Sequence, residues 1–253
     1  MILYVTYNDQ PSGVYWSQVT DVVEHLNSLG LEKVRLVAMV SIRGYFRSYR
    51  TIREHSPGAW VVPMVPRVHN WRINWLWLAL ITKLAHPQGI IARGIFATAM
   101  ALRLRDKGYV RTVCFDGRGA YGVEWEEYRI IDDDDLIAQC QIMEAEAIQR
   151  SDFRLAVSEA LVDHWRDRYG YDQHAHVVIP CTLGAEKERP ALAGGEEFRN
   201  SIGWSADQMV LVYSGGTGGW QSLDLLAKVL DGVLASDPMA CVLFLSGRDP
   251  YID

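Results

Sequence analysis

The chain reads Ile2-Leu-Tyr-Val-Thr-Tyr-Asn-Asp-Gln-Pro-Ser-Gly-Val14 near its start, an apolar run that ends in a polar loop with a glycine. A short apolar run of this kind predicts a buried strand, and the helical periodicity over 14–29 predicts a helix behind it. A second run of the same type is Met209-Val-Leu-Val-Tyr-Ser-Gly-Gly-Thr-Gly-Gly219. The two stretches look like the openings of two similar βα domains.

Short apolar runs alternate with longer helical patterns up to residue 183. We expect strands near 2–6, 34–40, 60–62, 89–92, 111–115, 153–157 and 176–179. We expect helices near 14–29, 45–54, 71–85, 95–107, 133–150 and 159–168. Strands that alternate with crossover helices are typical of a parallel sheet covered on both faces. The sequence therefore predicts an α/β fold with a Rossmann-like, doubly wound parallel sheet.

The pattern divides the chain into three parts. Residues 1–183 form the first domain, and 184–205 form a linker, because they mix charged residues, Pro and Gly without a sustained apolar period. Residues 206–253 begin a second Rossmann-like domain, which we expect to be incomplete because only one helix and one strand follow its first strand. We expect this chain to be a truncated piece of a longer protein, or a chain whose missing layer a partner supplies.

The composition is that of an ordinary globular protein. The formal net charge of -6 argues against a nucleic-acid partner, which would call for a basic surface. The four cysteines, Cys114, Cys140, Cys181 and Cys241, lie too far apart to indicate a zinc knuckle or a compact disulfide framework. Because the chain enters its first strand without a secretory leader, we expect a cytoplasmic protein.

Ligands of an open parallel sheet bind beyond the carboxyl ends of its strands. Ser12 and Gly13 follow the first predicted strand, where a helix begins and offers free backbone N–H groups to an anion. The alternative is that Ser12 only caps the helix and Gly13 only turns the chain.

Charged residues beside glycines follow the fourth and fifth predicted strands. Arg93 precedes Gly94, and Asp116 and Arg118 alternate with glycines ahead of Glu124. Glycine lets a backbone approach a ligand closely while a neighbouring charged side chain contacts it. These residues are candidates for a ligand site, and a salt-bridged turn is the alternative.

Two sets of residues invite a metal interpretation. The run Asp132-Asp133-Asp134-Asp135 has the carboxylates that Mg²⁺ prefers, but acidic residues also stabilise the first turn of a helix, which we favour here. His174 and His176 lack a third ligand, so a surface loop that runs into a strand explains them more simply. The sequence predicts no metal site.

Two segments suggest a basic, aromatic surface near the cleft. Three tryptophans gather with aliphatic residues between positions 68 and 84, flanked by basic residues, as in helices that lie at a membrane interface. Arg43, Arg47 and Arg50 share one face of a predicted helix, with aromatic residues between them. This surface would bind anionic lipid headgroups or a phosphorylated acceptor. We favour the alternative, an apolar crossover helix packed on the sheet and a solvated arginine face, because crossover helices are commonly apolar.

The order of several motifs carries a resemblance. They are Pro11-Ser12-Gly13, Ala92-Arg93-Gly94, Asp116-Gly117-Arg118-Gly119, Asp152-Phe-Arg-Leu-Ala-Val-Ser158 and Val178-Ile-Pro-Cys181. This order resembles the N-terminal domain of group 1 (family four) glycosyltransferases of the GT-B fold. The stretch Leu211-Val-Tyr-Ser-Gly-Gly216, with Trp220-Gln221, is similar to the opening of that family's C-terminal nucleotide-binding domain. The resemblance covers essentially the whole chain.

The resemblance implies transfer of a sugar from a nucleotide-sugar donor to an acceptor hydroxyl, with retention at the anomeric carbon and without an obligatory metal or other cofactor. Catalytic roles are implied for Asp116, with Arg118 and Glu124 in support. The residues implied in donor binding are Ser12, Gly13, Gly215, Gly216 and Thr217. We assign acceptor binding to Arg93, Arg43, Arg47 and Ser158.

The chain departs from the family pattern in two ways. The family's first C-terminal loop and following helix usually offer an Arg and a Lys to the diphosphate, whereas 215–221 contain no basic residue. The family's pair of glutamates, which engages the donor's ribose and sugar, would lie beyond Asp253. We therefore expect this chain alone to be inactive.

The leading hypothesis is a retaining, hexosyltransferase-type glycosyltransferase of surface polysaccharide or glycolipid assembly. Its partners would be a nucleotide sugar and a glycan or lipid-linked acceptor, with peripheral association at the inner face of the membrane. The first alternative is a non-catalytic module that binds a glycan, a lipid or a protein. The second is a nicotinamide enzyme or epimerase, which the first loop disfavours because it lacks the spaced glycines.

Overall fold

The computed structural model describes residues 1–66, 70–129, 132–181, 194–217 and 221–247. The chain divides into two compact units. The first is Met1–Glu126 with Ile131–Gly184, and the second is Glu127–Ile130 with Ala185–Asp253. Residues 184–193 of the predicted linker lie outside the described residues, and helix α9 (Gly195–Ser201) occupies part of the remainder.

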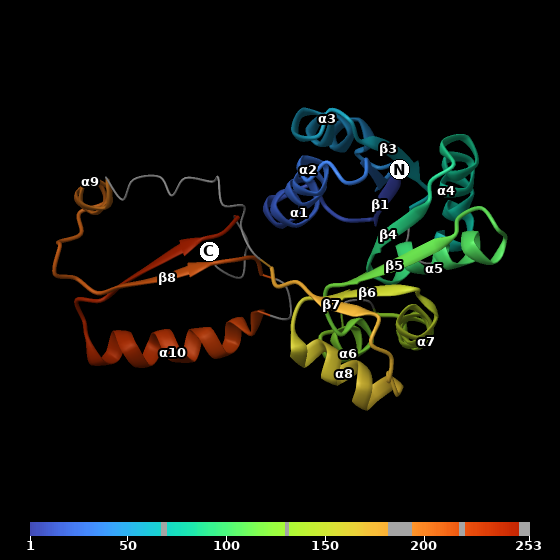
Figure 1. The fold of residues 1–253 in the computed structure, drawn as a ribbon. Helices are drawn as coiled ribbons and strands as arrows, with labels where there is room; N and C mark the ends of the chain where they lie inside the picture. Colours follow the sequence, from blue (N-terminus) through green and yellow to red (C-terminus); the bar gives the residue numbers. More distant parts are fainter. Residues whose placement is uncertain (67–69, 130–131, 182–193, 218–220, 248–253) are drawn as a thin grey trace. The chain divides into compact units, whose positions relative to one another are not determined.

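The first unit contains a seven-stranded sheet in which all strand pairs are parallel (Figure 1). Its strands are β1 (Ile2–Tyr7), β2 (Val34–Ser41), β3 (Trp60–Met64), β4 (Gly89–Arg93), β5 (Thr112–Gly117), β6 (Phe153–Ala156) and β7 (His176–Val178). The strand order is β3-β2-β1-β4-β5-β6-β7. The predicted Rossmann-like, doubly wound sheet is confirmed.

Helical segments connect these strands. They are α1 (Gly13–Tyr15), the π-helical turn η1 (Trp16–Thr20), α2 (Asp21–Ser28), α3 (Tyr45–His55), α4 (Trp71–Ala85), α5 (Gly94–Asp106), α6 (Tyr121–Glu127), α7 (Asp134–Arg150) and α8 (Glu159–Tyr169). The first three are consecutive and match the helix predicted over 14–29. The sequence did not predict α6, because its 7 residues are too few for a clear period.

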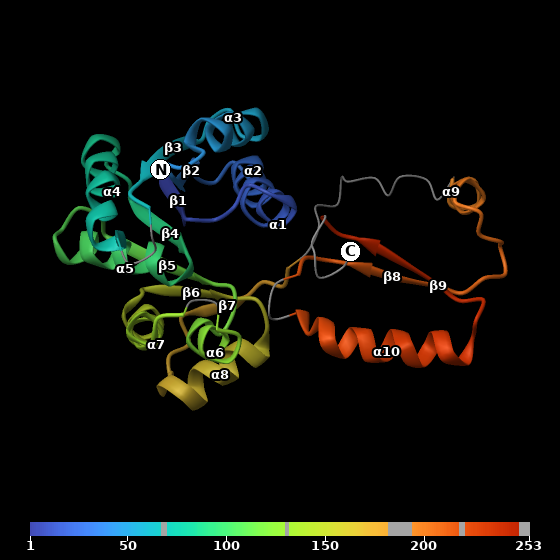
Figure 2. The same cartoon turned by 180° about the vertical axis from the view of Figure 1, so that it is seen from behind.

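Successive strand residues point to opposite faces of the sheet. Leu3 and Val5 join a buried cluster with residues of α4, α5, α7 and α8, whereas Tyr4 joins a second cluster with residues of α1, α2 and α3. Figure 2 shows α2 and α3 on one side of the sheet and α4 and α5 on the other. Arg47 and Arg50 lie in α3, whereas Arg43 precedes it, so the predicted helix face that includes Arg43 is wrong. Helices α3 and α4 are attached to opposite faces of the sheet, not to one shared helical layer.

Strand β1 marks the switch point of the sheet. It pairs with β2 on one side and with β4 on the other, and the helices that follow β1 and β4 belong to opposite layers. Doubly wound folds bind ligands at the carboxyl ends of the strands at this point. The residues that follow β1, β4 and β5 therefore occupy the position where a site is expected.

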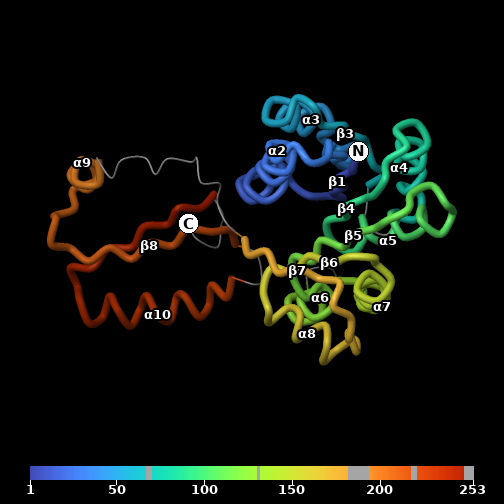
Figure 3. The backbone as a smooth tube through the Cα atoms, in the orientation of Figure 1, coloured from blue at the N-terminus to red at the C-terminus, as the bar shows by residue number. Residues whose placement is uncertain are grey.

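The second unit contains β8 (Val210–Ser214) and β9 (Cys241–Leu245), which pair in parallel and are connected through α10 (Leu223–Ser236). Figure 3 shows the backbone of these elements. No residue of α10 is buried, and Val212 of β8 is 56% exposed, within the described part of the chain. The predicted βα opening is present, but its apolar side chains are far less covered than those of the first unit.

Candidate functional site

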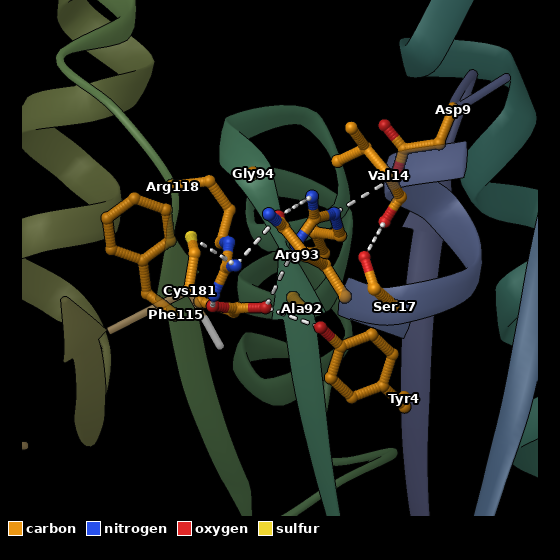
Figure 4. A network of polar contacts seen from close by, with 12 residues as sticks. Tyr4, Asp9, Val14, Ser17, Ala92, Arg93, Gly94, Phe115, Arg118 and Cys181 are labelled. Carbon is orange, nitrogen blue, oxygen red and sulfur yellow. Dashed lines mark hydrogen bonds and ion pairs between the residues drawn. The ribbon is translucent and has the colours of Figure 1, made fainter. Parts of the chain in front are cut away.

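Four charged side chains gather where β1, β4 and β5 end (Figure 4). Asp9 follows β1, Arg93 is the last residue of β4, Asp116 lies in β5 and Arg118 follows β5. The parallel register pairs Arg93 with Asp116 on neighbouring strands. Figure 4 shows Arg93 between Asp9 and Arg118, so three segments that are distant in sequence meet at the switch point.

Asp116 is the buried centre of this cluster, with 2% of its side chain exposed. The Tyr4 hydroxyl donates a hydrogen bond to Asp116 Oδ2 over 2.5 Å. Arg93 Nη1 lies 3.7 Å from the same oxygen, and Arg118 Nη1 lies 3.4 Å from Asp116 Oδ1. Because a buried carboxylate without partners is strongly destabilising, these three groups fix Asp116 in place.

Gln18 connects the two arginines from the first helix. Its Oε1 accepts hydrogen bonds from Arg93 Nη2 over 3.2 Å and from Arg118 Nη2 over 2.8 Å. Gln18 lies in the π-helical turn η1, next to the buried Val19. Such turns are rare and occur frequently at functional sites. This one directs an amide into the charged cluster while its neighbour stays in the core.

Three polar atoms of the cluster are buried without a hydrogen-bond partner among the described residues. They are Asp9 Oδ2, Arg93 Nη1 and Arg118 Nε. Asp9 Oδ2 lies 3.5 Å from Arg93 Nε, at ion-pair distance, although 37% of the Asp9 side chain is exposed. Buried polar atoms without hydrogen bonds cost free energy. Ion pairs compensate for two of them, since Arg93 Nη1 also lies 3.7 Å from Asp116 Oδ2.

The cluster shifts the pKa values of its members. Burial raises the pKa of Asp9 to about 6, against the effect of Arg93 and together with that of Asp116. Burial also raises the pKa of Tyr4, and Asp116 adds to this shift. Burial works against the charged form of Arg93, but Tyr4, Asp9 and Asp116 outweigh it and raise its pKa. Near neutral pH, Tyr4 and Arg93 keep their protons, whereas Asp9 can exchange one.

A buried glutamate fixes the segment that follows Arg118. Glu144 accepts hydrogen bonds from the backbone N–H of Tyr121 over 2.9 Å, from that of Gly122 over 2.7 Å and from the Tyr169 hydroxyl over 2.8 Å. Tyr121 in turn reaches the start of α5, where a Cβ on Gly94 would lie 3.1 Å from its hydroxyl oxygen. Gly94 also has a φ of +75°, so this position requires glycine.

Two predicted site residues cap helices. Glu124 Oε1 accepts a hydrogen bond from the Ala120 N–H over 3.1 Å, at the start of α6. Ser158 Oγ accepts one from the Leu161 N–H over 3.2 Å, at the start of α8. These contacts give Glu124 and Ser158 structural roles, and their catalytic and acceptor-binding roles stay predictions.

The predicted glycine loop lies open at the start of α1. Ser12 occupies the N-cap position, but its side chain makes no capping hydrogen bond. A Cβ on Gly13 would meet no atom within 4 Å. Arg43 and Arg47 lie exposed before and within α3, and neither belongs to the network of Figure 4. The donor and acceptor roles of these four residues stay predictions.

The predicted donor residues of the second unit follow β8. The Tyr213 hydroxyl donates a hydrogen bond to the Gly216 carbonyl over 2.5 Å. A Cβ on Gly215 would lie 3.0 Å from that hydroxyl oxygen, so Tyr213 packs closely against the loop. Thr217 follows directly, whereas Gly218 and Gly219 lie outside the described residues. In its described part, the loop is held by the Tyr213 hydroxyl.

The aspartate run starts a helix. Asp133 Oδ1 accepts a hydrogen bond from the Leu136 N–H over 3.0 Å, and Asp134 and Asp135 lie in the first turn of α7. Carboxylates at this end of a helix interact favourably with its dipole. This is the role that the sequence favoured. Across the described residues, no three His, Cys, Asp or Glu side chains are grouped as metal ligands.

No protein-family model matches this sequence, and no curated protein matches it either. Several solved structures are similar to this chain. HepE from Anabaena, in complex with UDP and glucose, has a TM-score of 0.66 at 12% identity, over 98% of this chain and 69% of HepE. A glycosyltransferase from Rickettsia africae has a TM-score of 0.61 at 13% identity, over 99% of this chain and 69% of its own.

A third solved structure is an epimerase. UDP-GlcNAc 2-epimerase from Neisseria meningitidis, bound to UDP-GlcNAc, has a TM-score of 0.65 at 9% identity, over 100% of this chain and 67% of its own. The fold is of the GT-B type. This chain spans about two thirds of the length of these GT-B structures. At such low identities the likeness shows the fold and does not assign an activity.

Sequence reasoning missed three members of the cluster. Tyr4 lies inside an apolar strand, where an aromatic residue predicts core packing. Gln18 lies inside a helix and reaches the arginines only because of the π-helical turn. Asp9 belongs to the predicted loop after β1, but only its contact with Arg93 marks it as part of the site. The position of Asp9 at a strand end was the one available signal.

Proposed function

We propose that this chain is part of a nucleotide-sugar-dependent glycosyltransferase, in which the first unit binds the acceptor and the second begins the donor-binding half. The charged cluster at the switch point carries this proposal. The GT-B-type fold supports it, because solved proteins of that fold contain UDP or a UDP-sugar. Retention, independence of a metal, and a role in surface polysaccharide or glycolipid assembly are part of the proposal.

The chemistry of the cluster suits a sugar. Arg93 and Arg118 balance the two aspartates, so the cluster is close to neutral when Asp9 and Asp116 are ionised. Two buried N–H groups and one carboxylate oxygen offer both donors and acceptors. A hydroxyl group uses both kinds of partner, whereas a polyanion would meet the aspartates as repulsive neighbours.

Each residue has a distinct role in this proposal. Asp116 orients the two guanidinium groups, and Arg93 and Arg118 donate hydrogen bonds to acceptor hydroxyls. The backbone at Gly13 approaches the donor phosphates, where N–H groups stabilise the charge of the leaving group. For the second unit, we propose that the loop that begins at Gly215 binds the donor. We also propose a cytoplasmic location and, because the chain spans about two thirds of its structural relatives, no transfer by this chain alone.

Calorimetric titration with UDP-glucose and UDP-GlcNAc, each with and without candidate acceptor sugars, tests the site. Arg93→Met should weaken binding of the acceptor sugar by about 10- to 150-fold, because a charge-assisted hydrogen bond contributes about 1.5–3 kcal/mol. The matched control is Arg150→Met, which removes a surface ion pair with Asp106 and should leave binding unchanged. Equal losses in both variants, or no binding of any acceptor sugar, would contradict the proposal.

Measurements on the complete protein identify the reaction type. NMR of its products should show a new glycosidic bond with the anomeric configuration of the donor, formed only when an acceptor is present. An inverted anomeric centre would contradict the retaining mechanism. Binding without turnover by the complete protein would favour the non-catalytic module instead.

An epimerase is the second candidate, and Asp9 is the observation that favours it. A carboxyl group with a pKa of about 6 beside Arg93 can act as both acid and base near neutral pH. The test is incubation of UDP-GlcNAc in D₂O without an acceptor. An epimerase would incorporate deuterium at the sugar carbon whose configuration changes and would lose this activity in Asp9→Asn, whereas a transferase would leave that carbon unlabelled.

A further inference from the structure

Helix α4 is apolar on nearly all sides. On one side, Leu78, Ala79 and Thr82 are buried against the core of the first unit. On the other side, large apolar residues face solvent: Ile73 (54% exposed), Leu76 (55%), Trp77 (43%), Leu80 (49%) and Leu84 (76%). A helix that is apolar all round is normally enclosed by protein or lipid. The exposed side of α4 is therefore a surface without its partner within the described residues.

The exposed residues form a continuous stripe. Their spacings of three, one, three and four positions keep them on one face of the helix. From Ile73 to Leu84 the stripe runs for about 16 Å, at about 1.5 Å per residue. Single exposed apolar residues are ordinary on protein surfaces, but contiguous apolar stripes mark binding sites.

Cations border this stripe. Helix α4 contains Arg72 and Lys83 and no acidic residue. Both are exposed and lie next to the stripe on the helix surface, whereas Arg103 and Lys107 of the neighbouring segment contact Trp75, which packs against the core outside the stripe. The chain as a whole carries a net charge of -6, so this border runs against its overall balance. An apolar stripe with cations along its edge complements a surface that is apolar inside and anionic outside.

We propose that α4 lies in the interface of an anionic lipid bilayer, with the stripe from Ile73 to Leu84 among the acyl chains and the bordering cations at the headgroups. Amphipathic helices bind membranes in this way, by apolar burial together with attraction to anionic lipids. In the part of the chain that the structure describes, no helix meets the length and apolarity needed to cross a bilayer, so this is attachment in the plane. The inference does not depend on the proposed function.

Flotation of the full chain with lipid vesicles tests this surface. The wild type should float with vesicles of phosphatidylcholine and phosphatidylglycerol, and less with phosphatidylcholine alone. Leu76→Ser and Leu80→Ser should each lower the partition coefficient about 10- to 150-fold, since burial of a leucine contributes about 1.5–3 kcal/mol. Lys83→Gln should lower it about 5-fold on anionic vesicles only.

Leu31→Ser is the matched control, because Leu31 is 83% exposed and lies in the turn before β2. It should float like the wild type. Circular dichroism checks that the α4 variants remain folded, which their exposed positions predict. Flotation that is unaffected by Leu76→Ser and Leu80→Ser, or absent on anionic vesicles, would overturn the inference. Light scattering without lipid provides a second test, since self-association that these variants abolish would assign the stripe to a second copy of the chain.

Discussion

Strand β1 lies inside a seven-stranded sheet between β2 and β4, whereas β8 pairs only with β9 among the described residues. Both strands open a βα unit with a glycine loop. Five of the six residues of β1 are buried, but none of β8 is. β1 ends beside charged groups from β4 and β5, whereas the loop after β8 contacts its own Tyr213. A shared local pattern thus becomes a charged site only where neighbouring strands deliver their ends to it.

The two units also differ in how charged side chains are stabilised. In the first unit, charged groups stay buried because they compensate one another: Asp116 is held by Tyr4, Arg93 and Arg118. Assembling such a cluster requires a sheet that already fixes several strand ends in register. In the described residues, the second unit has one strand pair, β8 and β9, and the loop after β8 is bonded to Tyr213.

Removal of the central carboxylate should have the largest effect. Asp116→Ala leaves two arginines without their buried partner, and we expect a loss of about 3–5 kcal/mol in the free energy of unfolding of the first unit. Urea unfolding, followed by hydrogen exchange in peptides from β4 and β5, measures this loss. Asp163→Ala is the control, because the Asp163–Arg166 ion pair is exposed, and it should change stability by less than about 1 kcal/mol. A similar small change in Asp116→Ala would mean that the cluster does not stabilise the sheet.

The same substitution in the two opening strands should give the next largest effect. Val5 of β1 is fully buried, whereas Val212 of β8 is 56% exposed. Val5→Ala should cost about 2–3 kcal/mol, through lost burial and a cavity, and Val212→Ala less than about 0.5 kcal/mol. Hydrogen exchange of the β1 and β8 peptides measures both. A large cost at Val212 would indicate that the second unit is covered in solution by a further layer.

The pH dependence of stability should give the smallest effect. The pKa of Asp9 is about 6 in the folded chain, above the value of about 3.9 expected when unfolded. Between these values the folded state binds more protons, so the contribution of Asp9 to stability falls as pH rises from about 4 to 6. Asp9→Asn lacks this dependence and should be more stable at pH 7 by about 1 kcal/mol or less after solvent screening, with no gain at pH 4. Thermal unfolding across this range measures it, and a gain that is equal at both pH values would disprove the assignment to Asp9.

Local patterns predicted most of the first unit, because its strands and helices carry clear apolar periods. Each of the seven strands begins within one residue of the expected position. Arg93 and Asp116 were identifiable as site candidates, since each lies beside a glycine at the carboxyl end of a strand. Their contact distances were not, because these depend on register and on side chains from other elements.

What local patterns could not predict depends on long-range contacts. Helix α6 is short, and its start is held by Glu144 from α7, 22 residues away from Gly122. The predicted role of Glu124 illustrates the same limit. A glutamate after a strand suggests chemistry, yet this one bonds to the backbone four residues before it. Sequence spacing alone does not distinguish a carboxylate that faces a ligand from one that caps a helix.

The π-helical turn at Trp16–Thr20 determines where Gln18 meets the two arginines, and it does so by the number of residues in the turn. A π-helical turn accommodates one more residue than an α-helical turn, so it changes how the faces before and after it are aligned. Tyr15, Val19 and Val23 are all buried on either side of Gln18. Deletion of one residue in this turn would rotate Gln18 relative to Arg93 and Arg118, although the charged residues of the cluster all lie outside the turn. Insertion or deletion of a single residue in the first helix would therefore change the hydrogen bonds of Gln18 to the two arginines.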